Sequence, residues 1–264
     1  MRTTVVTGAA GGMGTAIRAY LEGNGEKVIG VDVADADVVA DLSTAEGRDA
    51  MIEEIGQLCG GKLDGVVAGA GLANREDIPG DLVTSVNYFG GVATLDGLRP
   101  MLPKGDAPRA VGISSNSMSV VPVVQKLLDL YDAGDEAGAR ELSNQFDNAQ
   151  PAVYATSKFG FARWIREQTI KAEWIGSGIA LNAIAPGVIA TPMNTEEGLK
   201  AVLALGDDYP VPAGRPGTAD EIAGLVGFLL SERAGFCCGT VMFIDGGTEP
   251  ALRRDDSPAP RAFV

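Results

Sequence analysis

Short apolar runs of strand length alternate with helical patterns along most of the chain. The apolar runs predict strands over residues 3–7, 27–32, 63–68, 110–114, 179–185 and 240–244. Apolar positions at helical spacing predict helices over residues 13–23, 44–59, 81–102, 154–175 and 218–231. Strands that are apolar on both faces and alternate with helices favour right-handed crossovers and a parallel sheet covered on both sides. We therefore expect an α/β fold built on a doubly wound parallel sheet of about seven strands.

Two segments interrupt this alternation. Residues 118–150 separate a strand from the next helix by more than a tight loop needs, and positions 123–130 and 136–146 have the pattern of two short amphipathic helices. Residues 188–213 form a second long connection that is mostly apolar. We expect a single domain over residues 1–250 that carries both segments, followed by an acidic, proline-containing tail over 251–264 with little regular structure.

Composition narrows the chemistry. The formal net charge is −14, from 35 acidic and 21 basic residues, which opposes binding to nucleic acids and to anionic membranes. No apolar stretch is long enough to span a bilayer. The chain has no His, and its three Cys have no metal-ligand spacing, so we expect no metal. Acid–base chemistry must then use Tyr, Lys or a carboxylate. The few cysteines, and a start that enters a strand without a signal peptide, favour the cytoplasm.

A glycine-rich turn follows the first predicted strand and opens a helix, with the sequence Thr7-Gly8-Ala9-Ala10-Gly11-Gly12-Met13-Gly14. Glycines let the backbone approach a pyrophosphate closely, and the helix dipole favours an anion there. In this context the turn predicts a Rossmann-type dinucleotide site, whereas glycines alone would indicate only a tight turn. Asp32 ends the second predicted strand. Its carboxylate is either a solvated acid or the acceptor for both adenosine-ribose hydroxyls, which favours NAD over NADP because it repels a ribose phosphate.

Tyr154 and Lys158 lie one helical turn apart on the same predicted face. A free phenol titrates at about 10, and a nearby ammonium together with a cationic nicotinamide would lower its pKa. Such a pair also occurs by chance in many helices. Ser114 and Ser115 stand at the carboxyl end of a predicted strand, where open α/β sheets build their sites. Asn87 interrupts a helical pattern, where Asn is unfavourable unless its side chain has a task. Each could instead be a buried polar group satisfied locally.

In combination these motifs resemble the short-chain dehydrogenase/reductase family. The likeness rests on Thr-Gly-x-x-x-Gly-x-Gly, Asn87, a strand-end serine, Tyr-x-x-x-Lys and Pro186-Gly187-x-x-x-Thr191, and it extends over residues 3–247. Each motif is modest, but their order and spacing together are highly specific. The resemblance implies an NAD-dependent oxidoreductase that acts on CH–OH donors, with a helical insertion before the catalytic tyrosine.

The resemblance also implies roles for four residues. Tyr154 would be the general acid–base, and Ser115 would bond the substrate oxygen, because the serine of this family is the second of the pair. Lys158 would bind the nicotinamide ribose and lower the pKa of the tyrosine, and Asn87 would anchor a water in a proton relay. A pure cofactor binder has no use for this relay, so the set opposes a non-catalytic NAD-binding sensor or scaffold.

The cofactor contacts follow from the same likeness. Asp41 and Leu42 resemble an adenine clamp, and Ile189 and Thr191 would bind the nicotinamide carboxamide. The segment Ala68-Gly69-Ala70-Gly71 departs from the Asn-Asn-Ala-Gly of the family, so its contacts must come from the main chain. The expected cofactor-binding residues are Gly8, Gly12, Met13, Gly14, Asp32, Asp41, Leu42, Ala70, Gly71, Tyr154, Lys158, Pro186, Gly187, Ile189 and Thr191.

Residues 28–32, 40–48 and 86–90 are similar to the bacterial 3α-hydroxysteroid dehydrogenase/carbonyl reductase branch of the family, in which a helical insertion also precedes the tyrosine. This likeness implies reversible oxidation of a secondary alcohol to a ketone on a hydroxysteroid or similar hydrophobic substrate. It also implies a homodimer or homotetramer whose packing the insertion shapes. A terpenoid, a cis-diol or another secondary alcohol is the alternative substrate. The apolar side chains of residues 191–212 either line the substrate pocket or only pack their loop.

Overall fold

The computed structural model describes residues 1–73, 75–147, 151–191 and 196–256. Three stretches that carry sequence-based expectations lie outside the described residues: 148–150 of the insertion, 192–195 of the substrate loop and 257–264 of the tail. Within the described ranges, no helix has both the length and the apolar character that crossing a membrane requires.

A seven-stranded parallel sheet forms the centre of the molecule, with strand order β3-β2-β1-β4-β5-β6-β9. The order reverses between β1 and β4, which is where doubly wound sheets open a crevice for ligands. Six of the strands lie where the apolar runs predict them, and the seventh, β3, has two residues. The strands are β1 Thr3–Thr7, β2 Lys27–Asp32, β3 Val38–Val39, β4 Gly65–Ala68, β5 Arg109–Ile113, β6 Ala180–Pro186 and β9 Val241–Ile244, while β7 Ile189–Ala190 and β8 Gly217–Thr218 pair separately.

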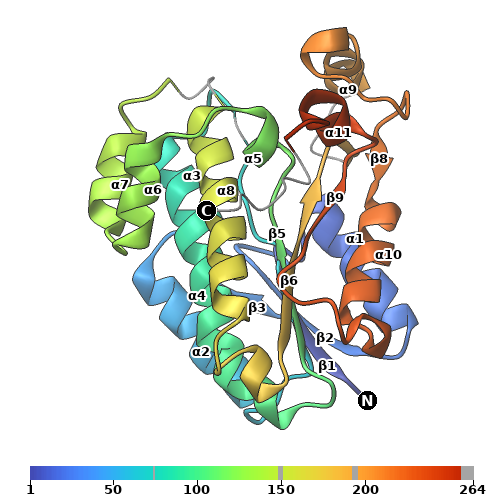
Figure 1. Cartoon of the computed structure of the whole chain (residues 1–264). Coiled ribbons are helices and arrows are strands. Elements are labelled where there is room, and N and C mark those ends of the chain that lie inside the picture. Colours follow the sequence, from blue (N-terminus) through green and yellow to red (C-terminus); the bar gives the residue numbers. More distant parts are fainter. Residues whose placement is uncertain (74, 148–150, 192–195, 257–264) are drawn as a thin grey trace, which may run out of the picture.

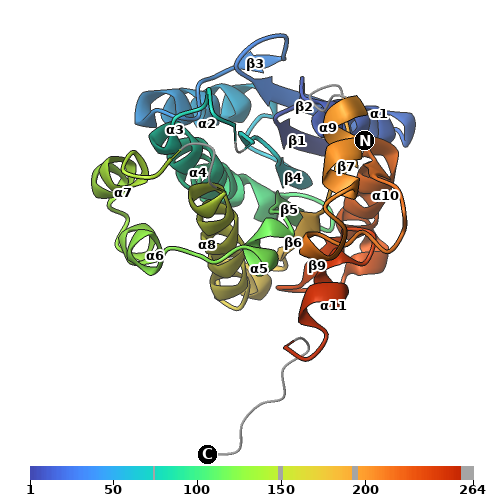
Figure 2. The ribbon, with the colours of Figure 1, turned by 90° about the horizontal axis from the view of Figure 1, so that it is seen from above.

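Helices cover both faces of the sheet, as expected (Figures 1 and 2). The α-helices are α1 Gly12–Gly23, α2 Ala45–Leu58, α3 Gly80–Thr84, α4 Gly91–Leu98, α5 Ser117–Val120, α6 Gln125–Asp132, α7 Glu136–Ser143, α8 Ala152–Thr169, α9 Glu196–Leu203, α10 Ala219–Leu230 and α11 Thr248–Arg253. The other helical segments are the π-helix η1 Ser85–Gly90 and the 3₁₀ turns η2 Arg99–Lys104, η3 Ile175–Ser177, η4 Gly206–Asp208 and η5 Glu232–Ala234. Helices α1 and α10 pack on one face, and α2, α4 and α8 pack on the other.

Alternate strand residues divide the core into two layers. Val5 of β1 belongs to the cluster under α2, α4 and α8, whereas its neighbour Val6 belongs to the cluster under α1 and α10. Both side chains are fully buried. Because successive side chains of a strand point to opposite faces, a strand between two helical layers must be apolar at nearly every position. This explains why the strands appear in the sequence as continuous apolar runs.

The helix predicted over residues 81–102 is present but not uniform. It comprises α3, the π-helix η1, α4 and the 3₁₀ turn η2. The π-helix contains Asn87, and the 3₁₀ turn contains Pro100 and Pro103, which cannot donate to an α-helical ladder. A π-helical turn re-aims the side chains that it carries and is frequent at functional sites.

The insertion packs as a short helical layer outside α3 and α8 (Figure 2). Helices α6 and α7 occupy the two predicted positions, and α5 is an additional turn after β5. Tyr131 of α6 stacks on Tyr88 with ring centroids 4.2 Å apart. Arg48 of α2 pairs with Glu136 of α7 at 2.7 Å, and Arg140 pairs with Asp81 at 3.0 Å. These contacts join the insertion to three elements of the main body, η1, α2 and α3.

The end of α8 and the presence of α11 differ from the prediction. Helix α8 ends at Thr169 rather than at 175, because the Thr169 hydroxyl donates to the carbonyl of Leu181 and ties the helix end to the sheet. The chain then turns so that Trp174 is fully buried, edge-on to Trp164. Helix α11 was not predicted, and its N-terminal amides are held by Asp245, as described below.

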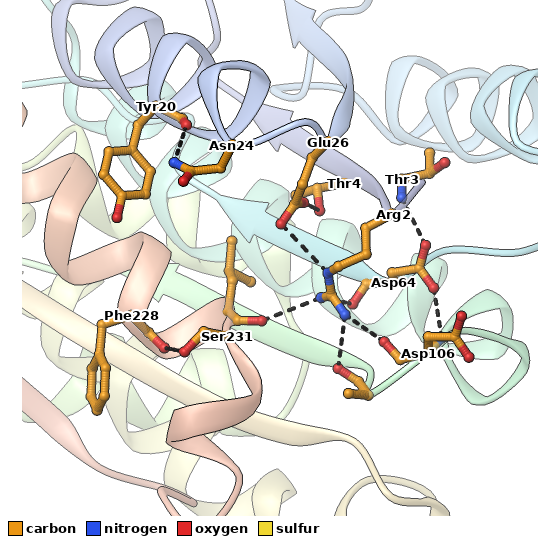
Figure 3. A network of polar contacts seen from close by, with 12 residues as sticks. Arg2, Thr3, Thr4, Tyr20, Asn24, Glu26, Asp64, Asp106, Phe228 and Ser231 are labelled. Atoms are coloured by element: carbon orange, nitrogen blue, oxygen red, sulfur yellow. Dashed lines mark hydrogen bonds and ion pairs between the residues drawn. The ribbon is translucent and has the colours of Figure 1, made fainter.

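The amino end of the sheet is closed by a polar network (Figure 3). The Arg2 guanidinium donates to the carbonyl of Asp64 at 3.0 Å and pairs with Glu26 at 3.4 Å. The Asp64 carboxylate accepts from the backbone amides of Thr3, at 2.7 Å, and Asp106, at 2.6 Å. These bonds satisfy backbone polar groups at the amino ends of the strands. A ligand site is therefore expected at the opposite edge of the sheet, where the strands have their carboxyl ends.

Candidate active site

The predicted site residues gather at the carboxyl edge of the sheet, toward which the strand arrows point in Figure 1. The glycine turn follows β1, Asp32 ends β2, and the 69–71 turn follows β4. Ser115 follows β5, Pro186 ends β6, and Tyr154 and Lys158 reach this edge from α8. In an open α/β sheet, this edge is where ligands bind.

The glycine turn leaves no space for side chains on its inner side. Gly8 has a φ of +75°, and a Cβ on it would lie 2.9 Å from the backbone of Ala70. A Cβ on Gly14 would lie 2.0 Å from the Gly8 carbonyl oxygen, so helix α1 can begin this close to β1 only with glycine there. Gly12 and Met13 begin α1, and the N-cap Gly11 offers no side chain to its amides. These amides and the dipole of α1 therefore form an open anion-binding end.

Asp32 faces the glycine turn. Its carboxylate accepts from the backbone amides of Ala10 at 3.0 Å and Val33 at 2.8 Å. These bonds fix the half-buried side chain at the end of β2. Each oxygen retains a lone pair, so the group can still accept from hydroxyl donors beside the turn.

The departure from Asn-Asn-Ala-Gly is compensated by Thr7. Its hydroxyl oxygen accepts from the amides of Gly69 and Ala70, both at 3.1 Å. The turn after β4 is thereby held against the turn after β1 without an asparagine side chain. A Cβ on Gly71 would lie 3.0 Å from Lys158 Nζ and 3.2 Å from Asn87 Oδ1, so Gly71 stands directly beside both groups. Sequence reasoning assigned no task to Thr7.

Both the oxygen and the nitrogen of the Asn87 side-chain amide form hydrogen bonds. Its Oδ1 accepts from the amide of Leu72 at 2.7 Å, and its Nδ2 donates to the Leu72 carbonyl at 3.0 Å. The Nδ2 also lies 3.4 Å from the Ser157 hydroxyl. The side chain thus joins η1, the turn after β4 and α8. This contact explains an asparagine inside a helical segment, and the 1 % exposure of Asn87 makes each bond important.

Lys158 is buried beneath this site, with 5 % of its surface exposed. Its Nζ donates to the carbonyl of Ile113 at 3.1 Å and lies 6.0 Å from the centre of the Tyr154 ring. Burial lowers the pKa of Lys158 to about 8, which still leaves the ammonium protonated at neutral pH. The structure therefore keeps one positive charge close to the phenol.

The two serines after β5 have different surroundings. The Ser114 hydroxyl donates to the backbone carbonyl of Lys158 at 2.9 Å and faces α8. The Ser115 hydroxyl accepts from the amide of Ser117 at 3.2 Å, and its side chain lies close enough to Tyr154 to lower the pKa of the phenol. Of the pair, Ser115 is the one beside the phenol.

The pKa of Tyr154 differs from the sequence-based expectation. We expected the neighbouring ammonium and a bound cation to lower it, but in the chain alone burial raises the pKa of Tyr154. The side chain of Ser115 acts in the opposite direction, and its effect is weaker. The reason is that Lys158 lies beside the ring at 6.0 Å and bonds a backbone carbonyl rather than the phenol oxygen. Desolvation of the phenolate therefore prevails.

The remaining predicted cofactor residues are divided between surface and core. Asp41 is exposed, and its hydrogen bonds with Ser43 lower the pKa of its carboxyl. Leu42 is 5 % exposed and belongs to the core, so only its main chain can face a ligand. Ile189, the first residue of β7, is also 5 % exposed, and its side chain packs in the core. Gly187 follows β6, and a Cβ on it would lie 2.7 Å from Asp245. Thr191 is half-buried at the start of the substrate loop.

Three further residues adjoin this group: Asn116, Asp245 and Tyr209. Asn116 and Asp245 carried no expected role, and Tyr209 was expected only as one of the side chains of 191–212 that line the substrate pocket or pack their loop. The Tyr209 hydroxyl bonds Asn116 at 2.9 Å, although the two are 93 residues apart in sequence. Asp245 was noted only as part of a closing Asp-Gly-Gly motif. Nothing in the local pattern marks a side-chain bond over such a separation. Across the ranges that the structure describes, His, Cys, Asp and Glu side chains form no group that could hold a metal ion.

Comparison with known proteins identifies the family of the chain. Residues 141–249 match the family described as enoyl-(acyl carrier protein) reductase. A 3-alpha-hydroxysteroid dehydrogenase/carbonyl reductase from Comamonas testosteroni is 36 % identical over 258 residues, which are 96 % of this chain and 98 % of that protein. The 3beta-hydroxysteroid dehydrogenase 1 of Eggerthella lenta is 25 % identical over 265 residues, 93 % of each chain.

Among solved structures, the 3-alpha-hydroxysteroid dehydrogenase from Pseudomonas sp. B-0831 complexed with NADH superposes with a TM-score of 0.83 and 35 % identity, over 96 % of this chain and 99 % of that one. The likeness therefore extends over nearly the whole of both chains. The chain belongs to the short-chain dehydrogenase/reductase family.

Proposed function

We propose that this protein is an NAD-dependent dehydrogenase that reversibly oxidises a secondary alcohol to a ketone, with a hydroxysteroid or a similar hydrophobic alcohol as substrate. The observation that carries the proposal is the meeting of four side chains at one point. Ser115 adjoins Tyr154, and Lys158 lies beside the Tyr154 ring and beside Gly71, which also adjoins Asn87. A phenol, a hydroxyl, an ammonium and an amide are the groups that this chemistry needs in a chain without His.

The fit of NAD rests on the glycine turn and Asp32. Gly8 and Gly14 keep the turn free of side chains, so a pyrophosphate can approach the amides that begin α1. Asp32 is held beside that turn by two backbone amides, where it would accept from the adenosine-ribose hydroxyls and repel a ribose phosphate. When bound, NAD supplies the acceptor for the hydride that leaves the carbinol carbon.

The residues of the chain then handle the proton and the developing charge. In oxidation, the Tyr154 phenolate takes the proton of the substrate hydroxyl, and Ser115 stabilises the charge on the substrate oxygen. Because burial raises the pKa of Tyr154, its phenolate needs positive charge nearby, and Lys158, 6.0 Å from the centre of its ring, is the cation of the chain beside it. Asn87 holds the turn after β4 and the start of α8 together, and would place a water for the proton relay. Reduction reverses the same steps.

The substrate side is apolar and little buried. All residues of α9 are described, and none of them is buried, although Leu199, Val202 and Leu203 lie along it. Leu205 is 50 % exposed. Side chains that only packed their loop against the sheet would be covered, so this exposure favours contact with a hydrophobic ligand. The steroid class also agrees with the names of the relatives above.

We also infer a homo-oligomer and a cytoplasmic location. The phenyl ring of Phe236 is fully exposed and Phe228 is 39 % exposed, which a subunit contact would cover. The insertion, with its two anchoring ion pairs, is the segment that we expect to shape subunit packing. Cys59, Cys237 and Cys238 are all free thiols, in agreement with a reducing compartment.

The test combines a substrate screen with one variant. Absorbance of NADH is followed for 3α-hydroxysteroids, terpenoid alcohols, cis-diols and simple secondary alcohols. We expect turnover to be highest with the steroids, and a higher rate with another class would replace the substrate assignment. Tyr154→Phe should abolish turnover while NADH binding, measured by fluorescence, is unchanged. Tyr20→Phe, which removes a hydroxyl from the far side of α1, is the control. Wild-type rates in Tyr154→Phe would refute the mechanism.

A further inference from the structure

Tyr209 is joined to the candidate active site by a chain of three side chains. Its phenol bonds Asn116 Oδ1 at 2.9 Å, and Asn116 Nδ2 lies 3.5 Å from the Asp245 carboxylate. Asn116 directly follows Ser115 and is 2 % exposed. Asp245 follows β9 and accepts from the amides of Gly247, at 3.0 Å, and Glu249, at 2.7 Å. Asp245, at the far end of this series of three side chains, is therefore anchored to the N-terminus of α11.

The chemistry of these groups sets the direction of every bond. A carboxylate can only accept, so Asn116 must turn its NH₂ group toward Asp245. Its carbonyl oxygen then faces Tyr209, and this oxygen also can only accept. The phenol proton of Tyr209 is consequently committed to Asn116. Toward any other partner, the phenol oxygen of Tyr209 is an acceptor and cannot donate.

The segment that carries Tyr209 is held in place beside the site. The amide of Ala213 donates to the Gly246 carbonyl at 2.9 Å, and a Cβ on Gly247 would lie 3.2 Å from Pro212. Burial and the nearby charges of Asp245 and Tyr154 raise the pKa of Tyr209, so its phenol stays protonated at neutral pH. Tyr209 and Tyr154 approach the site from different elements: Tyr209 reaches Asn116, the neighbour of Ser115, from the loop after η4, and Tyr154 reaches it from α8.

We propose that Tyr209 is a specificity-determining residue whose phenol oxygen accepts a hydrogen bond from a second hydroxyl of the substrate. The proposal rests on the proposed function, in which Tyr154 and Ser115 already bind the reacting oxygen. A second hydroxyl can donate to Tyr209, whereas a carbonyl at the same place offers no proton and leaves the acceptor without a partner. A site built to bond a hydroxyl rejects analogues that lack it more strongly than an apolar pocket rejects a missing methylene. The substrate class is therefore a hydrophobic secondary alcohol with one further hydroxyl.

The experiment compares substrates that differ by one group. Lithocholate, with its single 3α-hydroxyl, is measured beside its 7α-hydroxy and 12α-hydroxy counterparts and the matching ketones. Cyclohexanol and its 1,2-diols form a second set that contains no steroid. We expect the wild type to favour at least one dihydroxy substrate over its monohydroxy partner. Tyr209→Phe should lower kcat/KM for that substrate by about 3–10-fold, the worth of one neutral hydrogen bond, and leave the monohydroxy partner unchanged.

Two variants complete the design. Tyr20→Phe is the matched control and should leave every ratio as in the wild type. Asn116→Leu releases the phenol proton, so the keto counterpart should gain relative to the hydroxy substrate. Equal losses for all substrates in Tyr209→Phe would mean a structural role and overturn the proposal, as would unchanged ratios or a wild type without preference. Absence of turnover with every alcohol tested, monohydroxy and dihydroxy alike, would instead overturn the proposed function, and this proposal with it.

Discussion

The Ser114 hydroxyl donates to the backbone carbonyl of Lys158 at 2.9 Å and so ties the end of β5 to α8. A second bond joins the same two elements: Lys158 Nζ donates to the carbonyl of Ile113, the last residue of β5, at 3.1 Å. The two bonds set the height of α8 along the sheet. They place Tyr154, one turn earlier in α8, beside Ser115, which follows Ser114 and points the other way.

This arrangement predicts different outcomes for the two serines. Ser114→Ala should lower the free energy of unfolding by about 1–2 kcal/mol, since a buried carbonyl loses its donor, while kcat falls little. Ser115→Ala should retain stability and lose about 10²–10³-fold in kcat, because it removes a donor to the reacting oxygen. Urea unfolding and steady-state kinetics on both variants decide this. A larger kinetic loss in Ser114→Ala than in Ser115→Ala would reverse the assignment.

Lys158 should destabilise the fold at neutral pH while serving the chemistry. Its pKa is about 8 in the folded chain against 10.5 for the free group, so the folded state releases a proton that the unfolded state still holds between these values. Stability therefore rises with pH from about 8 to about 10.5, and below pH 8 the full penalty of burying the ammonium is present. At about 1.4 kcal/mol per pH unit, that penalty is about 3 kcal/mol.

Lys158→Met should thus be inactive yet at least as stable as the wild type at pH 7, because relief of the penalty exceeds the loss of the bond to Ile113 by about 2 kcal/mol. Urea unfolding of both proteins at pH 7, 9 and 10.5 measures the difference, which should shrink as pH rises and reverse in favour of the wild type by about pH 10.5. A difference that stays constant across this range would mean that Lys158 does not titrate there.

The fold was largely predictable because its strands are buried on both faces. Residues 3–7 and 27–32 coincide with β1 and β2, where each valine and isoleucine side chain belongs to one of the two core clusters. The missed strand, β3, has two residues, and pairing with β2 rather than composition creates it. The prediction extended α8 too far because Trp174 continues the apolar pattern, although a turn and not the helix buries it.

The candidate site was predictable only where neighbours in sequence meet in space. Tyr154 and Lys158 are four residues apart, and the glycine turn is contiguous, so their patterns are visible. The bond between Tyr209 and Asn116 joins side chains 93 positions apart, and no local periodicity encodes it. The effect of burial on the pKa of Tyr154 is hidden for the same reason, since distant elements bury the phenol.

Asp32 should set the cofactor preference. We expect the wild type to use NAD better than NADP, and Asp32→Ser to lower that preference about 10–100-fold, because the serine removes the repulsion of a ribose phosphate and one of two acceptors for ribose. Values of kcat/KM with each cofactor at fixed alcohol concentration test it. Asp35→Asn removes a neighbouring charge from the same loop and should change the ratio little. A wild type that prefers NADP would contradict this account of β2.

The insertion should control how subunits pack. Tyr131 of α6 covers Tyr88, which is 4 % exposed, and the two rings stack at 4.2 Å. Replacing residues 123–146 with a short Gly-Ser linker would expose this aromatic surface along η1 and α8, so we expect the mass measured by light scattering to change. Lys126→Ala alters an exposed position of α6 and leaves the insertion in place, so its mass should equal that of the wild type. Unchanged mass in the shortened chain, with circular dichroism showing an intact fold, would remove the insertion from the subunit interface.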